Sequence, residues 1–133
     1  MASHSRRLTK NTPRILLVED DNILAGMYKK KFQLAGMKLD HAKDGSEALK
    51  RVRRKYQLIL LDILLPHHDG FEVLTNIRAS RENASTPVFL LTNLSDVETV
   101  ARARLLNIQA YLIKAHVTPL EIVTKVLKIL EPV

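Results

Sequence analysis

Four consecutive aliphatic residues, Leu58 to Leu61, lead directly into Asp62, and turn residues follow at Pro66 and Gly70. An apolar run of this length with turn residues behind it is typical of a strand buried on both faces of a parallel sheet. In an open α/β sheet the carboxyl ends of the strands form the crevice where ligands bind. The run therefore predicts a central strand and places Asp62 at the mouth of a site.

Four further strand-like runs alternate with helical patterns along the chain. The expected strands lie at 14–19, 37–41, 58–61, 88–91 and 110–113, and the expected helices begin after Asp20 or Asp21, at Gly45, after Asp69, after Ser95 and after Thr118. Five such alternations with right-handed crossovers give an α/β fold with a doubly wound, five-stranded parallel sheet and helices on both faces. We expect one domain over 14–133, preceded by a flexible basic arm at 1–13.

Apolar residues at helical spacing predict which side of each helix is buried. The expected inner faces are Leu24, Met27, Tyr28, Lys31 (through its stem) and Leu34 in the first helix; Ala48, Leu49 and Val52 in the second; Phe71, Val73, Leu74 and Ile77 in the third; Val97, Val100, Ala101 and Leu105 in the fourth; and Ile122, Val126 and Ile129 in the fifth.

The net charge of +7 is concentrated in three places: residues 1–14, Lys29–Lys31 and Lys50–Lys55. Such clusters are either solvated surfaces or docking surfaces for an acidic partner or nucleic acid, and charge alone does not decide between them. The chain has no cysteine and no apolar run long enough to span a membrane, and its N-terminus lacks the apolar core of a signal peptide. We therefore expect a cytoplasmic protein without membrane insertion.

Polar residues with complementary chemistry follow four of the strands: Glu19 and Asp20, Asp62, Thr92, and Lys114. Clustered carboxylates raise one another's pKa unless a cation neutralises them, and oxygen ligands without His or Cys favour Mg²⁺. A divalent metal, a lysine and a hydroxyl together suit phosphoryl transfer, which depends on positioning and charge neutralisation. Asp62 would then be the nucleophile and form an acyl phosphate.

This arrangement resembles the receiver domain of two-component response regulators, of the stand-alone type similar to chemotaxis regulators. The resemblance covers Arg14 to about Leu130. It is carried by Glu19-Asp20, by Asp62 with Pro66 and Gly70 behind it, by Thr92, Tyr111 and Lys114, and by Asp44–Leu49 at the entrance to the second helix. It implies a flavodoxin-like (βα)5 fold with sheet order 2-1-3-4-5.

The resemblance also implies how the site is loaded. A histidine kinase or histidine phosphotransfer protein donates a phosphoryl group to Asp62. Mg²⁺ is held by Asp20, Asp62 and the backbone carbonyl of Leu64, and Glu19 holds a water on the metal. The protein would then not be an enzyme beyond catalysing its own phosphorylation and dephosphorylation.

The implied output is a switch. Thr92 hydrogen-bonds the phosphoryl group and draws Tyr111 inward, which changes the face made by the fourth helix and fifth strand. That face would bind a downstream protein target, which the sequence does not identify. Because no output domain follows the last expected helix, we expect a stand-alone receiver.

Three positions depart from the family pattern. Ala115 replaces the proline that usually follows the lysine in a cis bond. A non-proline cis bond costs about 2.5–4 kcal/mol. The Lys114-Ala115 bond is therefore either trans with a rearranged loop or cis under strain. Asn93 replaces a small residue and would narrow access to Asp62. Leu64 is apolar and would slow an attacking water.

Two alternative functions stay open. The first is a receiver-like interaction module that is not phosphorylated; it is disfavoured because Asp20, Asp62, Thr92 and Lys114 are all present. The second is a nucleic-acid-binding protein that uses the basic arm; the chain lacks a helix-turn-helix, serial aromatic residues and a zinc signature, so we do not expect this partner. We expect the adjacent His67 and His68 to be exposed loop residues and not metal ligands.

Overall fold

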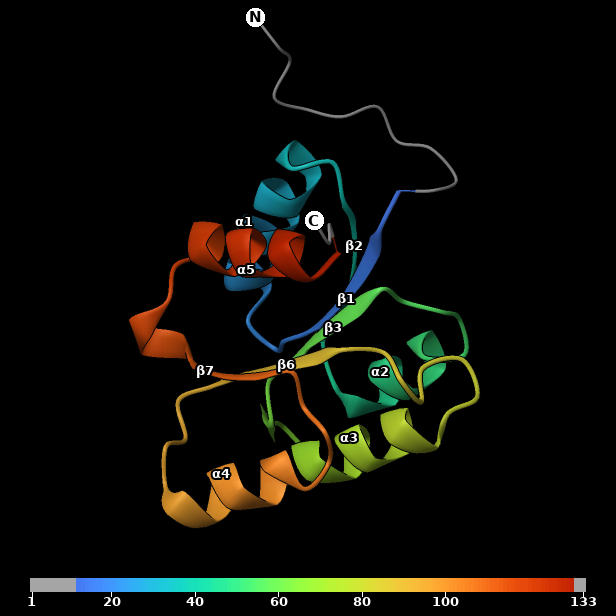
Figure 1. Ribbon diagram of the computed structural model, residues 1–133, viewed down its shortest axis with the longest axis vertical. Coiled ribbons are helices and arrows are strands. Elements are labelled where there is room, and N and C mark those ends of the chain that lie inside the picture. Colours follow the sequence, from blue (N-terminus) through green and yellow to red (C-terminus); the bar gives the residue numbers. More distant parts are fainter. Residues whose placement is uncertain (1–11, 131–133) are drawn as a thin grey trace, which may run out of the picture.

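The computed structural model describes residues 12–130 and shows a parallel sheet with helices on both faces (Figure 1). The elements are β1 (Arg14–Val18), α1 (Asn22–Leu34), β2 (Lys38–Ala42), α2 (Gly45–Arg51), β3 (Leu58–Leu61), β4 (Leu64–Leu65), β5 (His68–Asp69), α3 (Gly70–Ala79), β6 (Val88–Thr92), α4 (Val97–Arg104), β7 (Ala110–Ile113), the 3₁₀ turn η1 (Lys114–His116) and α5 (Pro119–Leu130).

The order of the main sheet is β2-β1-β3-β6-β7, and every neighbouring pair is parallel. Since β6 and β7 are the fourth and fifth of the long strands, the predicted doubly wound order is confirmed. The short strands β4 and β5 form a separate antiparallel pair between β3 and α3. That pair was not predicted, and it lies between the central strand and the helix that was expected after Asp69.

Alternate side chains of each central strand face two separate cores. Ile59 and Leu61 pack in the core that α2, α3 and α4 cover, whereas Leu58 and Leu60 pack in the core beneath α1 and α5. Figure 1 shows the same division, with α1 and α5 on one side of the sheet and the other three helices opposite. Burial on both faces explains why the run from Leu58 to Leu61 is uniformly apolar.

Side-chain caps set the ends of several helices. Asp21 caps α1 by accepting hydrogen bonds from the N–H groups of Ile23 and Leu24, and Gly36, at φ 84°, follows its end. At α5, Thr118 Oγ1 accepts from the Glu121 N–H at 3.1 Å, and Glu121 Oε1 accepts from the Thr118 N–H at 2.9 Å. A helix was expected to begin after Thr118, and these two bonds form a reciprocal capping box at that start.

The predicted inner face of α1 was wrong in part. Tyr28 is buried as expected, but its buried companions are Ala25 and Phe32. Met27 and Leu34 are 51% and 46% exposed. Helix α1 has apolar residues on two adjacent stripes, and both stripes have helical spacing, so periodicity alone does not select the one that meets the sheet.

The prediction for α4 was wrong to a greater degree. Val97 and Leu105 are 84% and 83% exposed, and Ala103 is the helix's buried residue. The helix is held further by Arg102, whose guanidinium carbon lies 4.2 Å from the centroid of the Phe71 ring of α3. Val97 at the start of α4 and Leu105 at its C-cap therefore face solvent.

Smaller corrections concern α2 and α5. Helix α2 begins at Gly45 as expected and ends at Arg51, and Leu49, which was expected on its inner face, is exposed. In α5, Val123 is buried with Ile122 and Val126, whereas Ile129 is exposed. The predicted faces of α3 are confirmed: all four of its expected residues are buried.

Residues 1–11 and 131–133 lie outside the described chain, so most of the predicted arm is not described. At its end, the Pro13 carbonyl accepts a hydrogen bond from the Lys38 N–H at 2.9 Å. Within residues 12–130, no helix has the length and apolar character needed to cross a bilayer.

Candidate functional site

The parallel register brings the predicted site residues to one edge of the sheet. Val18 of β1 pairs with Leu61 of β3, so the residues that follow them, Glu19 and Asp62, lie side by side at the strand ends. On the other side of β3, Thr92 ends β6 and pairs with Ile113, directly before Lys114. Adjacent strands thus deliver the carboxylates, the hydroxyl and the amine to the same crevice.

Lys114 joins two of these carboxylates. Its Nζ lies 2.7 Å from Glu19 Oε1 and 2.8 Å from Asp62 Oδ2. Glu19 is fully buried and Asp62 is 4% exposed. Buried carboxylates need a partner, because desolvation strongly disfavours an isolated charge. The ammonium of Lys114 is that partner for both acids.

The ionisation of Glu19 and Lys114 reflects this pairing. Burial raises the pKa of Glu19, and the Lys114 ammonium and the Asp21 N–H offset part of that rise. For Lys114, burial by itself would lower the pKa, but hydrogen bonds to Asp62 and Glu19 outweigh it and raise the pKa above its ordinary value. Lys114 therefore stays protonated throughout the physiological pH range.

Asp20 completes an acidic cluster at the rim. Glu19, Asp20 and Asp62 each offer a carboxylate oxygen, and these three oxygens all lie within 4.8 Å of one another. Asp20 is exposed, and Asp21, not Asp20, caps α1. With Lys114 included, three carboxylates and one ammonium leave a formal charge of −2 in the crevice.

The donor set fits a hard divalent cation. It consists of carboxylate oxygens, and Mg²⁺ binds through one or two carboxylates while it keeps several waters. Among residues 12–130, the buried Glu19 Oε1 has no partner other than the Lys114 ammonium, so this oxygen keeps unused acceptor capacity. A charge of +2 would also neutralise the crevice.

The β3–α3 connection orients Asp62. The Leu64 N–H donates to Asp62 Oδ1 at 2.9 Å, so one carboxylate oxygen is held by the loop and the other by Lys114. Leu64 itself is about half exposed at 54%. Gly70 lies against the same backbone: a Cβ at Gly70 would be 2.2 Å from Ile63 Cα. The chain therefore passes too close to Ile63 at this point for any side chain.

Thr92 and Tyr111 meet the same loop from two sides. Thr92 is fully buried, and its Oγ1 accepts a hydrogen bond from the Leu94 N–H at 3.3 Å. The Tyr111 hydroxyl is half-buried and donates to the Leu94 carbonyl at 2.6 Å. Burial, together with the charge of Asp96, raises the pKa of Tyr111. Leu94 thus connects the predicted hydroxyl to the predicted aromatic residue.

The Lys114-Ala115 bond is trans, since residues 12–130 contain no cis peptide. Of the two alternatives expected for this bond, the trans bond is the one observed, and Lys114–His116 form the 3₁₀ turn η1. The Ala115 N–H donates to Asn93 Oδ1 at 2.9 Å. Two positions that depart from the family pattern therefore contact each other, which their separate inspection in the sequence did not predict.

His67 and His68 are both exposed, as expected. His68 packs over Gly45 at the start of α2, where an added Cβ would lie 2.7 Å from its Cγ.

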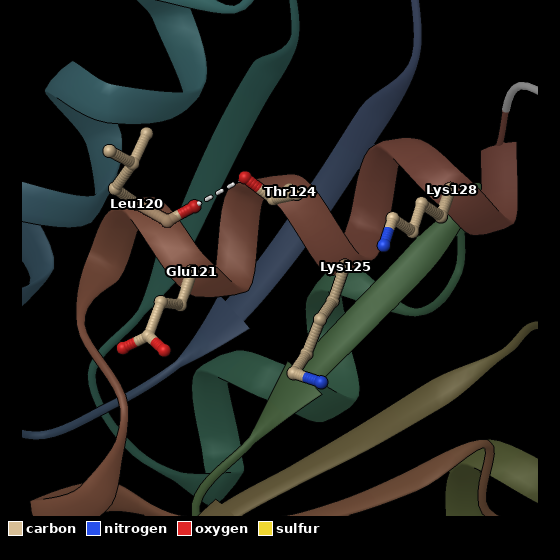
Figure 2. Close-up of a pocket in the computed structure, with 5 residues that line it drawn as sticks. All are labelled: Leu120, Glu121, Thr124, Lys125 and Lys128. Atoms are coloured by element: carbon tan, nitrogen blue, oxygen red, sulfur yellow. Dashed lines mark hydrogen bonds between the residues drawn. The ribbon is translucent and has the colours of Figure 1, made fainter.

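A shallow hollow on α5 is lined by Leu120, Glu121, Thr124, Lys125 and Lys128 (Figure 2). The figure shows the Lys125 and Lys128 ammonium groups at one end and the Glu121 carboxylate at the other. Thr124 Oγ1 donates to the Leu120 carbonyl at 3.0 Å and so makes its bond within the helix. None of the lining residues belongs to the acidic crevice.

Comparison with known proteins gives consistent matches. The model of the response regulator receiver domain family matches residues 15–127. Regulatory protein VanRB of Enterococcus faecalis is 41% identical in sequence, over 68% of this chain and 40% of its own length. Transcriptional activator protein IrlR of Burkholderia pseudomallei is 39% identical, over 76% of this chain and 43% of its own length. The chain thus spans less than half of these relatives.

Among solved structures, chemotaxis protein CheY4 of Vibrio cholerae superimposes with a TM-score of 0.81 over 89% of this chain and 98% of its own. It is 24% identical in sequence, so this similarity concerns the fold.

Proposed function

The chain belongs to the response regulator receiver domain family of two-component systems, and on this premise we propose that it accepts a phosphoryl group on Asp62 from a histidine kinase or a histidine phosphotransfer protein. One observation carries the proposal. The carboxylate of Asp62 is nearly buried, paired with Lys114 and adjacent to Glu19 and Asp20. A merely structural carboxylate would not need this concentration of charge around it.

In the proposed step, a carboxylate oxygen of Asp62 attacks the phosphorus of a phosphohistidine. The P–N bond breaks, the imidazole leaves with the electron pair and takes up a proton, and an acyl phosphate forms on Asp62. Lys114 already lies 2.8 Å from Asp62 Oδ2 and supplies positive charge for the phosphoryl oxygens. The buried hydroxyl of Thr92 supplies a hydrogen-bond donor from the neighbouring strand.

Asp20, Asp62 and the Leu64 carbonyl would hold Mg²⁺, with Glu19 binding one of its waters. When bound, the metal neutralises charge on the transferring phosphoryl group. The position of Asp20 at the exposed rim suits direct contact, whereas the buried Glu19 is already committed to Lys114. We propose no other cofactor, and no turnover beyond the domain's own phosphorylation and dephosphorylation.

The proposed output is the surface of α4 and β7. A phosphoryl group would accept a hydrogen bond from the Thr92 O–H, and movement of Thr92 toward it would lengthen the 3.3 Å bond that Thr92 Oγ1 accepts from the Leu94 N–H. The Leu94 carbonyl in turn accepts from the Tyr111 hydroxyl. A shift of this loop therefore frees Tyr111 to move inward. The exposed Val97 and Leu105 give α4 an apolar surface for a partner. That partner is another protein or, in a longer chain like the curated relatives, a further domain.

The acceptor assignment is tested by chemical trapping. The protein is incubated with Mg²⁺ and a small phosphodonor such as acetyl phosphate, the acyl phosphate is reduced with borohydride, and the modified peptide is sequenced by mass spectrometry. We expect the modification at Asp62. Modification at another carboxylate, with Asp62 intact, contradicts the proposal.

Mg²⁺ should raise the melting temperature of the unmodified protein. The ion binds the native carboxylate cluster and not the unfolded chain, so it stabilises by RT ln(1 + [L]/Kd), about 2.7 kcal/mol at a hundredfold excess over Kd. Asp20→Ala should remove most of this gain. Glu82→Ala, an exposed acid outside the cluster, should keep it. A melting temperature that does not respond to millimolar Mg²⁺ would show that the metal site is wrong.

The lysines of α1 should steer an acidic donor protein to the crevice. Lys30 and Lys31 line a groove of about 530 Å³ with Met27, Leu34, Thr118, Pro119 and Leu120, between α1 and the start of α5. A basic, partly apolar groove suits a helical partner with acidic and apolar residues. The other basic cluster, Lys50–Lys55, lies on the opposite side of the sheet, because α1 and α2 cover different faces. Both clusters therefore cannot form one continuous stripe for a nucleic-acid backbone.

Joint replacement of Lys29, Lys30 and Lys31 by Glu should slow phosphorylation by the donor protein and leave acetyl phosphate labelling nearly unchanged. The wild-type advantage should fade above about 0.1 M salt, where charges are screened beyond about 10 Å. Replacement of Lys50, Arg53 and Arg54 by Glu gives the same change in net charge on the opposite face and serves as the control. Equal rates for wild type and the α1 variant at low salt would refute steering by these lysines.

A further inference from the structure

One hydrogen bond joins the loop that follows Thr92 to the turn that begins at Lys114. Strands β6 and β7 are paired up to Thr92 and Ile113. Beyond that pair, Asn93 Oδ1 accepts from the Ala115 N–H at 2.9 Å. The carboxamide of Asn93 thus extends the connection between the strands past the end of the ladder, on the side that faces the acidic crevice.

The turn η1 needs this acceptor. The first N–H groups of a 3₁₀ or α-helical turn have no partner within the turn. No side chain caps η1 from its own start, where Ile113 occupies the cap position. Asn93 supplies the missing acceptor from a different loop, so the position of η1 depends on the β6–α4 connection.

Both residues next to this bond belong to the site. Lys114 directly precedes Ala115, and its Nζ reaches from β7, at the edge of the sheet, to Asp62 after β3 and Glu19 after β1. The side chain of Lys114 is flexible and does not by itself fix the ammonium in place. The position of the Lys114 backbone therefore decides whether the ammonium lies between both acids. On the other side, Thr92 directly precedes Asn93.

We propose that Asn93 is a positioning residue: its bond to the Ala115 N–H fixes Lys114 relative to Thr92 and thereby sets the geometry of phosphoryl transfer to Asp62. The functional half of this inference rests on the proposed function, whereas the positioning half does not. A proline at 115 has no N–H and cannot make the bond. Asn93 and Ala115 are therefore a matched pair, and the effect of either one depends on the other.

Amide hydrogen exchange, followed by NMR on the full chain without any phosphodonor, tests the positioning half. Asn93→Ala should speed exchange at the Ala115 N–H by roughly threefold to tenfold, the change that corresponds to loss of one ordinary hydrogen bond. Asn93→Asp keeps an acceptor oxygen at the same position and should retain the protection. Ser95→Ala, in the same loop, should not change it. Unchanged exchange at Ala115 in Asn93→Ala overturns the inference.

The functional half is tested with acetyl phosphate and Mg²⁺. Asn93→Ala should slow labelling of Asp62 severalfold without lowering the melting temperature by more than a degree or two, because Asn93 is exposed. In an Ala115→Pro background, which lacks the N–H, Asn93→Ala should have no further effect. If Asn93→Ala slows the labelling of Asp62 by the same factor in the wild-type and the Ala115→Pro backgrounds, the coupling is overturned. If wild type is not labelled at all, the proposed function fails, and the exchange experiment still decides the positioning role.

Discussion

Asp62→Asn should abolish phosphoryl labelling by acetyl phosphate. An amide oxygen is a poor nucleophile and cannot form an acyl phosphate, so the loss should be complete and not partial. The fold should persist, because asparagine has nearly the same size as aspartate and can still accept the Leu64 N–H with its Oδ1. The measurement is incorporation of phosphate, by intact mass, under conditions that label the wild type.

Asp69→Asn is the matched control. Asp69 is an exposed carboxylate in the same β3–α3 connection, and it caps α3 by accepting the Phe71 N–H at 2.9 Å. Asparagine caps helices about as well as aspartate. This variant should therefore be labelled like the wild type. Labelling of Asp62→Asn at the wild-type level would show that the acceptor is another residue.

Gly70→Ala should destabilise the protein by about 3 kcal/mol or more. The added Cβ would lie 2.2 Å from Ile63 Cα, 2.4 Å from its carbonyl oxygen and 2.6 Å from its carbonyl carbon. These are backbone atoms, which cannot rotate away as the end of a side chain can. Overpacking commonly costs about 1–3 kcal/mol, and a clash with backbone lies at or above that upper end. Chemical denaturation gives the free energy of unfolding.

Gly26→Ala is the control for this substitution. Gly26 lies inside α1, and no heavy atom lies within 4 Å of the Cβ that alanine would add. Alanine should therefore stabilise the helix by roughly 0.8–1 kcal/mol. A Gly70→Ala protein as stable as the wild type would refute the close approach. Because Ile63 directly follows Asp62, partial accommodation of the clash should still displace the acceptor and slow its labelling.

The sheet, and the gathering of polar residues at one edge of it, could be predicted because both follow from short-range signals. Each buried strand is a continuous apolar run, and parallel strands deliver the residues at their carboxyl ends to one edge. That rule is sufficient to bring Glu19, Asp62 and Lys114 together, and the observed ion pairs of 2.7 and 2.8 Å agree with it. The helix start expected after Thr118 is equally local, and Thr118 and Glu121 form the observed cap there.

The errors arose where burial depends on how a helix is rotated and how closely it packs. In α1 two apolar stripes compete, and the stripe with Ala25 and Phe32 meets the sheet while Met27 stays half exposed. In α4 the helical spacing of Val97 and Leu105 predicted burial, but both side chains are exposed to solvent. Under the proposed function these exposed apolar residues would belong to the partner-binding surface.

The bond between Asn93 and Ala115 could not be predicted from periodicity or strand ends. It depends on the conformation of two loops distant in sequence, and on a trans bond at Lys114-Ala115 that the family pattern left open. The only signal in the sequence was that both positions depart from that pattern. A pair of departures in neighbouring loops is a reason to look for a contact between them.

The measurement that tests the central claim most directly is the intact mass of the wild-type protein after incubation with acetyl phosphate, with Mg²⁺ in one sample and a chelator in the other. The crevice formed by Glu19, Asp20, Asp62 and Lys114 predicts one phosphoryl group per chain with Mg²⁺ and little or none with the chelator. A folded protein that gains no phosphoryl group in the presence of Mg²⁺, or gains it equally without the metal, would contradict the account.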